Sequence, residues 1–381
     1  MSNPISAVAK KMLYNSSIFL SNKKIILESS PDYNDSSRKI YEELLRRHIN
    51  DKYKIYWFVS NKKNLSEPIP KVKNVHFVNH FSLHGRLVQL TSKYIIDSNV
   101  FVGKLRKKQL RLFLDHGMAL KMAYDYAKHI GKWDYGILTS DYFIPSHIKL
   151  YGGTKSNYKI CGYPRNDGLL NDVHVKAADD DKKYIIWMPT YRNHRNPNGI
   201  QTGINFPFGM PCIENKKQLR ELNDHLAKNN TILVFRPHPA EDLSRFSSIK
   251  LSNIILFNDS IFAKTPQLYE SLKDTDALIT DYSSIYYDYL LLKKPIGLSI
   301  PDLKEYTASY ELAEDDFKGF MKGEYIETFD DLIRFVSDVA KGKKMFGKDM
   351  VWAMKRYNKY LDGNSSKRIV DLIEKEMKKD K

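Results

Sequence analysis

Two segments of this chain carry residues that could bind the phosphates of a nucleotide. Arg236 and His238 lie in an Arg-Pro-His-Pro sequence directly after an apolar run, and Ser283 and Ser284 separate another apolar run from a helix-like segment. Ligands of open α/β sheets bind at the carboxyl ends of strands, and the unpaired N–H groups of a helix N-terminus attract phosphate. These residues therefore indicate a site for a nucleoside diphosphate.

Three further clusters follow strand-like runs and contain the residue types that phosphoryl transfer needs. The reaction requires cations and N–H donors around the phosphates and a base for the incoming hydroxyl. Arg165 and Arg192 carry guanidinium groups that match phosphate oxygens. His116 and His238 are acid–base candidates near neutral pH. The three clusters are residues 115–121, 162–167 and 189–192.

The elements that position these clusters alternate between strand-like and helix-like segments. Such alternation predicts the α/β fold class, with mostly parallel sheets covered by helices on both faces. Strands are predicted at 24–27, 54–59, 75–78, 94–97, 110–114, 184–188, 231–235, 254–256 and 277–280. Helices are predicted at 36–48, 82–91, 216–228, 265–272, 284–292, 348–361 and 366–378.

The chain length and one polar run predict two domains. At 381 residues the chain is long for a single domain. The acidic stretch 177–183 reads as a linker, after which the strand–helix pattern restarts. We therefore predict an N-terminal acceptor- and membrane-facing domain at 1–175 and a C-terminal donor-binding domain at 176–381. The last predicted helix pair either caps the second domain or crosses back to the first.

The composition is that of a globular protein without membrane spans. Hydrophobic residues make up 42% of the chain, and no apolar run reaches the roughly 18 residues that a spanning helix needs. The N-terminus lacks a convincing apolar signal core. Cys161 and Cys212 are the two cysteines, which excludes a disulfide framework and a cysteine-rich metal site. These features predict a cytoplasmic protein.

The positive charge is concentrated in the N-terminal half. Up to Leu170 there are 28 Lys and Arg against 13 Asp and Glu, a net charge of +15, whereas the remainder carries +1. Such an asymmetry indicates an anionic partner, either nucleic acid or an anionic membrane surface, although a solvated basic face is the structural alternative. Each Lys or Arg near an anionic bilayer contributes about 1 kcal/mol, so a few suffice for reversible attachment.

Six motifs in order resemble the CDP-glycerol glycerophosphotransferase family, which builds wall teichoic acids and related capsule polymers. They read HGxxLK, GYPRND, PTYR, RPHP, TDYSSIYYDYLLLKKPI and YLDGNSSKR, and they cover most of the chain. The resemblance implies a GT-B fold, with two Rossmann-like doubly wound domains facing a central cleft and no required metal or other cofactor. It also implies a CDP-polyol donor held mainly by the C-terminal half and a lipid-linked acceptor approaching from the N-terminal half.

Carried over by position, the resemblance assigns roles to individual residues. His116 would be the base on the acceptor hydroxyl, and His238 would bind the donor phosphates and stabilise the transferring group. In this chain Asp115 stands where the family usually has an uncharged residue, so that it either orients His116 and raises its basicity or points away. The remaining expected substrate contacts are Gly117, Met118, Ala119, Leu120, Arg165, Thr190, Arg192, Arg236, Ser283, Ser284 and Asp288.

Several patterns have a structural reading beside the functional one. Ser283 and Ser284 could be only a helix cap, and Asp288 could be an exposed helical residue. His76, His80 and His84 have the spacing of a helical zinc site, but the apolar residues around His76 favour a strand followed by a turn. Asp274 and Asp276 imitate a metal-binding pair, for which turn and cap roles are the better explanation. No P-loop or GxGxxG sequence is present, which argues against ATP and NAD.

The sequence thus predicts a peripheral membrane transferase at the cytoplasmic face of the cell membrane. It would move glycerol phosphate from CDP-glycerol to a hydroxyl of an undecaprenyl-diphosphate-linked saccharide and release CMP. The alternatives are CDP-ribitol as donor, or a UDP-sugar glycosyltransferase or epimerase of the same fold. Nucleic-acid binding is disfavoured, because the basic run 104–111 lacks the aromatic and glycine signature of an RNA-binding sheet. The chain length weakly favours addition of one or a few units over long-chain polymerisation.

Overall fold

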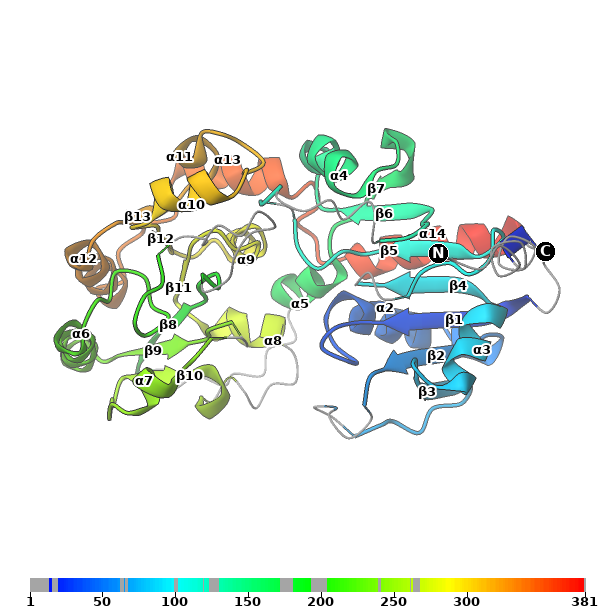
Figure 1. The fold of residues 1–381 in the computed structure, drawn as a ribbon, viewed down its shortest axis with the longest axis horizontal. Helices are drawn as coiled ribbons and strands as arrows, with labels where there is room; N and C mark the ends of the chain where they lie inside the picture. Colours follow the sequence, from blue (N-terminus) through cyan, green and yellow to red (C-terminus); the bar gives the residue numbers. More distant parts are fainter. Residues whose placement is uncertain are drawn as a thin grey trace, which may run out of the picture. The chain divides into compact units, whose positions relative to one another are not determined.

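The chain folds into two compact units, each built on one parallel sheet (Figure 1). Unit 1 comprises the described residues within 1–116, 125–171 and 359–381, and unit 2 those within 117–124 and 172–358. The computed structural model describes residues 14–15, 20–61, 65, 68–98, 102–118, 120–122, 130–171, 181–192, 204–238, 241–260, 262 and 268–379.

Unit 1 contains a seven-stranded sheet in the order β3-β2-β1-β4-β5-β6-β7, in which the neighbouring strands are parallel. This order has the reversal at β1 that marks a Rossmann-like sheet. The strands are β1 (Ser21–Glu28), β2 (Lys54–Val59), β3 (Val75–Asn79), β4 (Ser92–Asp97), β5 (Leu110–Phe113), β6 (Tyr135–Leu138) and β7 (Tyr158–Ile160). The helices are α2 (Asp35–Arg46), α3 (Leu83–Thr91), α4 (Ile144–Tyr151), α5 (Asp167–Leu170) and α14 (Ser365–Lys379).

The sheet of unit 1 is buried on both faces because its central strands are apolar at successive positions. In β1, Ile25 and Leu27 face the core beneath α2 and α14, whereas Ile26 faces a smaller core that includes Val88 of α3. A continuous apolar run of this kind is typical of a strand covered on both sides. Arg47 joins α2 to α14, since its guanidinium pairs with Asp371 at 2.6 Å and Glu374 at 2.7 Å.

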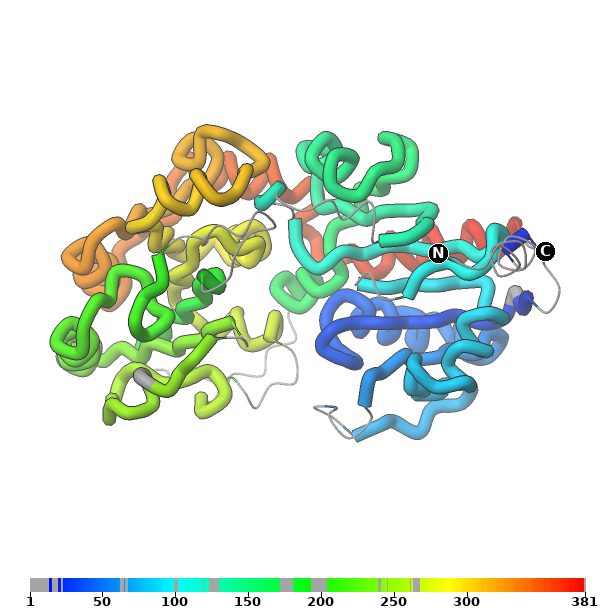
Figure 2. The backbone as a smooth tube through the Cα atoms, in the orientation of Figure 1, coloured from blue at the N-terminus to red at the C-terminus, as the bar shows by residue number. Residues whose placement is uncertain are grey.

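The C-terminal segment of the chain returns to unit 1 after unit 2 is complete. Figure 2 shows the chain end, drawn in red, among the blue and cyan elements of this unit. Ile369 and Ile373 of α14 are fully buried in the same core as β1 and α2. Unit 1 is therefore closed by residues more than 300 positions apart in the sequence.

Unit 2 contains a six-stranded parallel sheet in the order β10-β9-β8-β11-β12-β13. Its core between the sheet and the helices α6 and α12 includes Trp187, Leu222 and Phe335. The strands are β8 (Lys183–Trp187), β9 (Thr231–Phe235), β10 (Ile254–Leu256), β11 (Ala277–Thr280), β12 (Ile296–Ser299) and β13 (Glu324–Ile326). The helices are α6 (Lys216–Lys228), α7 (Ser244–Ser247), α8 (Leu268–Ser271), α9 (Ile285–Tyr289), α10 (Leu303–Ser309), α11 (Phe317–Phe320), α12 (Phe329–Ala340) and α13 (Lys348–Tyr357).

The predicted α/β fold class is confirmed, while some predicted boundaries are wrong. The helix predicted at 348–361 ends at Tyr357, because Asn358 adopts an extended backbone and its side-chain amide donates to Tyr287 O at 3.0 Å. The helix predicted at 284–292 divides into α9 and a 3-10 turn at Leu290–Leu292. Part of the helix predicted at 265–272 lies outside the described residues, and α8 begins at Leu268.

Candidate active site

His116 follows β5 in unit 1 and is paired with the residue directly before it. His116 Nδ1 lies 3.2 Å from Asp115 Oδ1, and the backbone N–H of His116 donates to the same oxygen at 2.7 Å. Asp115 has a φ of 60°, a left-handed conformation that residues other than glycine rarely adopt. The carboxylate of Asp115 raises the pKa of His116 above its ordinary value. Of the two sequence-based possibilities for Asp115, the structure thus shows the one in which it contacts His116.

The other side of the Asp115 carboxylate faces a second histidine. Asp115 Oδ2 lies 3.3 Å from Nε2 of the buried His147 on α4, and Tyr151 Oη donates to Asp115 Oδ1 at 3.3 Å. His147 Nδ1 lies 2.9 Å from the carbonyl oxygen of Phe143. Burial opposes ionisation of Asp115, but the two imidazoles hold its pKa well below the usual range.

Sequence reasoning missed His147, although it belongs to the same cluster as His116. A single histidine in the segment Ile144–Tyr151 has no spacing or motif that relates it to His116. Only the packing of α4 beside the end of β5 brings the two imidazoles to one carboxylate. The resulting His116–Asp115–His147 cluster fixes the orientation of the His116 ring through its Nδ1 atom.

Arg165 lies against the backbone of His116 rather than in open solvent. Its Nη1 atom donates to His116 O at 2.8 Å and lies 3.2 Å from Asp35 Oδ2, and the residue is 4% exposed. Nearby, the carboxylate of Asp167 accepts from the backbone N–H groups of Ser365 and Ser366, each at 2.8 Å. Two of the sequence motifs therefore meet in unit 1, where they hold the start of α14. The role of Arg165 as a substrate contact stays a prediction.

The residues of the HGxxLK motif after His116 belong to unit 2. Met118 and Leu120 are each 2% exposed, and Leu120 O accepts from Ala313 N at 2.8 Å. Met122 N donates to Glu311 O at 2.8 Å, so that this short stretch lies against residues 311–313. Ala119 lies outside the described residues. Substrate contact by Gly117, Met118, Ala119 and Leu120 stays a prediction.

Lys121, Arg236 and His238 form a cationic group in unit 2. Arg236 continues β9, with its backbone N–H donating to Trp187 O at 2.8 Å, and its guanidinium lies 5.4 Å from the ring centre of Phe257. The His238 ring stacks on Tyr191 with centroids 5.2 Å apart. Within the described parts of the chain, no carboxylate forms an ion pair with Arg236 or Lys121. Partly buried cations without acidic partners favour an anionic ligand.

Burial is the main cause of the pKa shifts of these three residues, and Asp281 acts against it at Lys121. Burial, followed by the charges of Lys121 and Arg236, lowers the pKa of His238. Burial also lowers the pKa of Arg236 from its ordinary value, and that of Lys121 to about 8. Lys121 is not among the predicted substrate contacts, although its place in the HGxxLK motif is a signal for it.

Arg192 differs from Arg236 because two buried carboxylates surround it. Its Nη1 atom lies 2.6 Å from Asp281 Oδ2, and its Nε atom lies 2.7 Å from Asp302 Oδ2. Arg192 is 4% exposed and both aspartates are fully buried. Asp281 also accepts from the backbone N–H of Thr190 at 2.9 Å. These pairs tie the end of β8 to the end of β11, and contact between Arg192 and a substrate stays a prediction.

Other predicted contacts of unit 2 lie around the end of β11. Thr190 Oγ1 is buried and has no hydrogen-bond partner among the described residues, and its contact with a substrate stays a prediction. Ser283 and Ser284 are half-buried at the start of α9, and Ser284 is the N-cap residue without a side-chain cap bond. Asp288 is buried and accepts from Tyr269 Oη at 2.8 Å, so its expected alternative as an exposed helical residue is wrong.

The two metal-like patterns have structural explanations. Asp276 accepts from the backbone N–H of Tyr184 at 2.8 Å and pairs with Lys183 Nζ at 3.0 Å. His76 lies in β3, His80 in the following turn and His84 in α3, so the three imidazoles do not share one helical face. Within the described residues no group of three or more His, Cys, Asp or Glu side chains could hold a metal ion.

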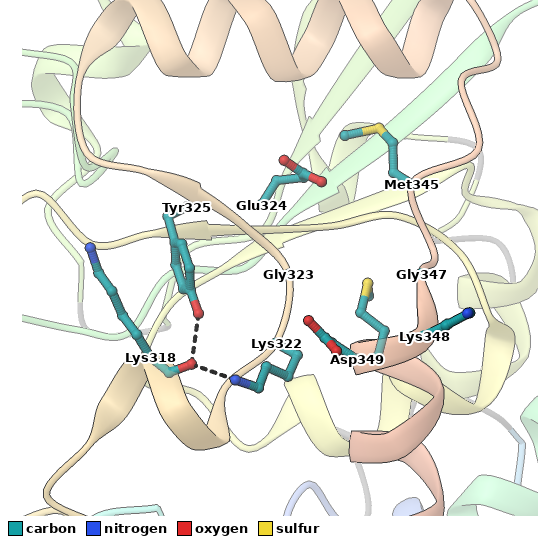
Figure 3. Close-up of a pocket in the computed structure, with 10 residues that line it drawn as sticks. Lys318, Lys322, Gly323, Glu324, Tyr325, Met345, Gly347, Lys348 and Asp349 are labelled. Carbon is teal, nitrogen blue, oxygen red and sulfur yellow. Dashed lines mark hydrogen bonds between the residues drawn. The ribbon is translucent and has the colours of Figure 1, made fainter.

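A cavity of about 510 Å³ in unit 2 contains none of the predicted site residues. It is lined by ten residues of the segments 318–325 and 345–350. Figure 3 shows the Tyr325 hydroxyl and the Lys322 ammonium turned toward the carbonyl of Lys318, to which they donate at 2.9 and 3.0 Å. Its lining contains three lysines and the carboxylates of Glu324 and Asp349.

The fold places the chain among GT-B-type proteins. A solved structure of the wall teichoic acid polymerase TagF matches it with a TM-score of 0.76 and 19% sequence identity, over 99% of this chain and 96% of that one. The predicted GT-B fold is thereby confirmed. Within the described residues, no helix has the length and apolar character that crossing a bilayer requires.

The chain belongs to the CDP-glycerol:poly(glycerophosphate) glycerophosphotransferase family, whose model matches residues 10–375. It is 23% identical over 94% of its length to the teichoic acid ribitol-phosphate polymerase TarL of Staphylococcus aureus (strain NCTC 8325 / PS 47). It is 25% identical over 84% of its length to the teichoic acid poly(glycerol phosphate) polymerase of Bacillus subtilis (strain 168). The chain spans 64% of the first relative and 44% of the second.

Proposed function

We propose that this protein transfers glycerol phosphate from CDP-glycerol to a hydroxyl of an undecaprenyl-diphosphate-linked saccharide and releases CMP. Family membership supports the reaction class. The observation that carries the proposal is the pair of partly buried cations Lys121 and Arg236 beside the His238 imidazole, which together suit a diphosphate. A transferase of this kind needs little covalent chemistry from the protein beyond positioning, charge stabilisation and one base.

His116 is the base in this mechanism. Its Nδ1 atom pairs with Asp115, so Nε2 is the ring nitrogen that accepts the proton of the acceptor hydroxyl. The hydroxyl oxygen forms a bond to the phosphorus that carries glycerol, and the bond from this phosphorus to the bridging oxygen of the diphosphate breaks. CMP leaves with that oxygen, and the developing imidazolium is stabilised by the Asp115 carboxylate.

The donor diphosphate is held by unit 2. Arg236 supplies a planar guanidinium and Lys121 an ammonium group, neither of which forms an ion pair with a described carboxylate, and the His238 ring adds an N–H donor. The Thr190 hydroxyl and the half-buried Ser283 and Ser284 supply neutral donors at the end of β11. Arg192 acts mainly by holding the Asp281 and Asp302 loops in place.

Ribitol phosphate is the second candidate for the transferred group. One relative is named for ribitol phosphate and another for glycerol phosphate, at 23% and 25% identity to this chain. The described residues include no motif that identifies the polyol-facing wall of the site. The distinction therefore belongs to an experiment with both donors.

The proposed location is the cytoplasmic face of the cell membrane, where the acceptor lipid would be reached. The net charge of +15 up to Leu170 suits an anionic bilayer rather than a neutral one. We propose no nucleic-acid partner, and binding to duplex or single-stranded DNA should be much weaker than binding to anionic vesicles. A metal and an organic cofactor are likewise absent from the proposed mechanism.

The test is CMP release from a panel of donors in the presence of a lipid-linked disaccharide. CDP-glycerol should be turned over at least tenfold faster than CDP-ribitol, and UDP-sugars should give no transfer. Faster turnover of CDP-ribitol would reassign the donor within the family. Preferential binding or turnover of a UDP-sugar would overturn the polyol-phosphate proposal.

A further inference from the structure

His147 on α4 is a buried histidine of unit 1 that the proposed reaction does not use. The residue is 1% exposed. Its ring lies among three aromatic rings, with centroid distances of 5.6 Å to Tyr151, 6.2 Å to Tyr158 and 6.2 Å to Phe143. Its Nδ1 atom lies 2.9 Å from Phe143 O. Because buried ring nitrogens need hydrogen-bond partners, the surroundings of the other nitrogen, Nε2, decide what this histidine does.

His147 Nε2 faces the carboxylate of Asp115, from whose Oδ2 atom it lies 3.3 Å away. Neither of these two buried atoms has a hydrogen-bond partner elsewhere in the described part of the chain. Although burial opposes its ionisation, His116 and His147 hold the pKa of Asp115 well below the usual range, so the carboxylate only accepts hydrogen bonds. A buried polar atom without a partner destabilises a fold. A hydrogen on His147 Nε2 satisfies both atoms at once.

Asp115 has a backbone conformation that needs support from its surroundings. Its φ of 60° lies in the left-handed region, which a residue other than glycine occupies only where neighbouring contacts hold it. Its Oδ1 atom accepts from the backbone N–H of His116 at 2.7 Å and from Tyr151 Oη at 3.3 Å. The described residues offer Oδ2 no hydrogen-bond partner besides His147. The position of the carboxylate therefore depends on His116 at one oxygen and on α4 at both.

We propose that His147 is a positioning residue for the base His116, and in this respect the inference rests on the proposed function. The Nε2–H group of His147 donates to Asp115 Oδ2 and holds the carboxylate where its Oδ1 atom lies 3.2 Å from His116 Nδ1. His147 thus acts through Asp115 and not on the substrate. A base that is oriented before the substrate binds needs no reorganisation during the reaction.

The way in which α4 is anchored separates this positioning role from simple packing. Tyr158 Oη donates to His147 O and to Gly152 O, each at 2.8 Å, so backbone atoms hold the end of the helix independently of the imidazole. His147→Phe keeps a ring for the aromatic contacts and removes the Nε2 donor. His147→Gln keeps a side-chain N–H the same number of bonds from the backbone as Nε2. Tyr158→Phe weakens the anchoring of α4 and leaves the imidazole in place, which makes it the matched structural control.

The first test titrates His116 by NMR in the full chain without donor or acceptor, with the signal assigned by its loss in His116→Ala. The charged groups that act on His116 are Asp115, Arg165 and Asp35, and the experiment changes Asp115 alone. Asp115→Asn should lower the pKa of His116 by about one unit, because the carboxylate raises it. In the His147→Phe background the same substitution should lower it by less than about half as much, since the carboxylate is no longer held. Equal effects of Asp115→Asn in the two backgrounds would overturn the inference.

Further backgrounds keep this result from depending on one variant. Asp115→Asn should have its full effect in Tyr158→Phe and in His147→Gln, and a reduced effect in Tyr158→Phe would assign the coupling to the packing of α4 and overturn the inference. Should His147→Phe fail to fold, His147→Asn replaces it, because the shorter amide matches Nδ1 rather than Nε2. The effect of Asp115→Asn should then be reduced in His147→Asn and full in His147→Gln. The same effect in these two backgrounds would contradict the role of Nε2.

The second test measures kcat and KM of the same variants by CMP release. His147→Phe should lower kcat by about tenfold and leave the KM for CDP-glycerol within about twofold, because the proposed donor site lies in unit 2. In the Asp115→Asn background His147→Phe should lower kcat no further, as expected for two residues of which one acts through the other. Losses that add would mean that His147 acts independently of Asp115, and the inference would be wrong.

The titration uses neither donor nor acceptor, so its outcome is separate from that of the proposed reaction. Absence of transfer by the wild type would contradict the proposed function while leaving the titration result in force. Transfer by the wild type without coupling between the two substitutions would overturn this inference alone.

Discussion

The two histidines singled out by the sequence lie in opposite electrostatic surroundings. In unit 1, the carboxylate of Asp115 pairs with His116 at 3.2 Å and raises its pKa. In unit 2, burial and the cations Lys121 and Arg236 lower the pKa of His238. The same side chain is thereby suited to two tasks, because a paired imidazole accepts a proton readily and one among cations favours an anionic ligand.

The arginines of unit 2 show a similar contrast. Arg192 is enclosed by the buried Asp281 and Asp302, whereas Arg236 has no ion-pair partner in the described part of the chain. A guanidinium already bound by two carboxylates stabilises the fold, and one without an acidic partner is available to phosphate. The neighbours of each side chain, rather than its type, therefore distinguish an arginine that stabilises the fold from a candidate for ligand binding.

The largest effect on stability is expected when Arg192, the arginine with two carboxylate partners, is replaced. Arg192→Ala should lower the free energy of unfolding of unit 2 by about 3–5 kcal/mol, because two buried carboxylates lose their partner. Thermal and urea denaturation measure this change. The matched control Arg334→Ala removes an exposed ion pair with Asp331 and should cost no more than about 1 kcal/mol. Equal stability of both variants would mean that Arg192 is not a structural residue.

Arg236→Ala should leave stability nearly unchanged and weaken binding of CDP-glycerol. The loss of charged hydrogen bonds to phosphate corresponds to about 1.5–3 kcal/mol, or roughly ten- to hundredfold in affinity. Isothermal titration calorimetry with CDP-glycerol measures it, with Arg356→Ala on the exposed side of α13 as control. Unchanged donor affinity in Arg236→Ala would remove Arg236 from the donor site.

The pKa of Lys121 predicts how donor binding depends on pH. Because this pKa is about 8, Lys121 is charged below pH 8 and loses its charge as pH rises through that value. Donor affinity should therefore fall by roughly tenfold between pH 7 and pH 9. Lys121→Arg should abolish the decline, and Lys121→Met should show the weaker affinity at both pH values. A wild-type affinity that is constant over this range would show that the Lys121 charge does not contribute.

The smallest expected effect concerns the base. Since His116 must be neutral to accept a proton, activity should rise with pH through its pKa, which Asp115 raises. Asp115→Asn should move this rise to lower pH by about one unit and lower the plateau rate, because the imidazole becomes less basic. The pH dependence of kcat/KM measures both changes. The exposed Asp141→Asn is the control, and an unmoved profile in Asp115→Asn would contradict the role of Asp115.

Most of the fold could be predicted from the sequence, because long apolar runs form its central strands. The runs at 54–59 and 231–235 became β2 and β9 with the predicted boundaries. The sequence-based prediction omitted β6, β7, β12 and β13, which are three or four residues long. Gly136 and Gly297 interrupt the apolar pattern of two of them and Glu324 begins a third, so pairing with neighbouring strands rather than propensity makes them strands.

From the sequence, the site could be predicted only as a set of candidate residues. Motif order identified His116, Arg236 and His238, but not which cations would have carboxylate partners. Asp302 is 110 residues from Arg192 in the sequence, and no local sequence pattern predicts that the two form an ion pair. His147 likewise joins Asp115 only through the packing of α4. The long-range contacts between buried charges therefore could not be predicted from the sequence.

The most direct test of the account compares His116→Ala with His238→Ala in two assays. Calorimetry with CDP-glycerol measures donor affinity, and CMP release with a lipid-linked acceptor measures transfer. The account predicts that His116→Ala binds the donor like the wild type and loses transfer by at least about a hundredfold, whereas His238→Ala loses both. Transfer by His116→Ala within tenfold of the wild type, or full donor affinity in His238→Ala, would contradict it.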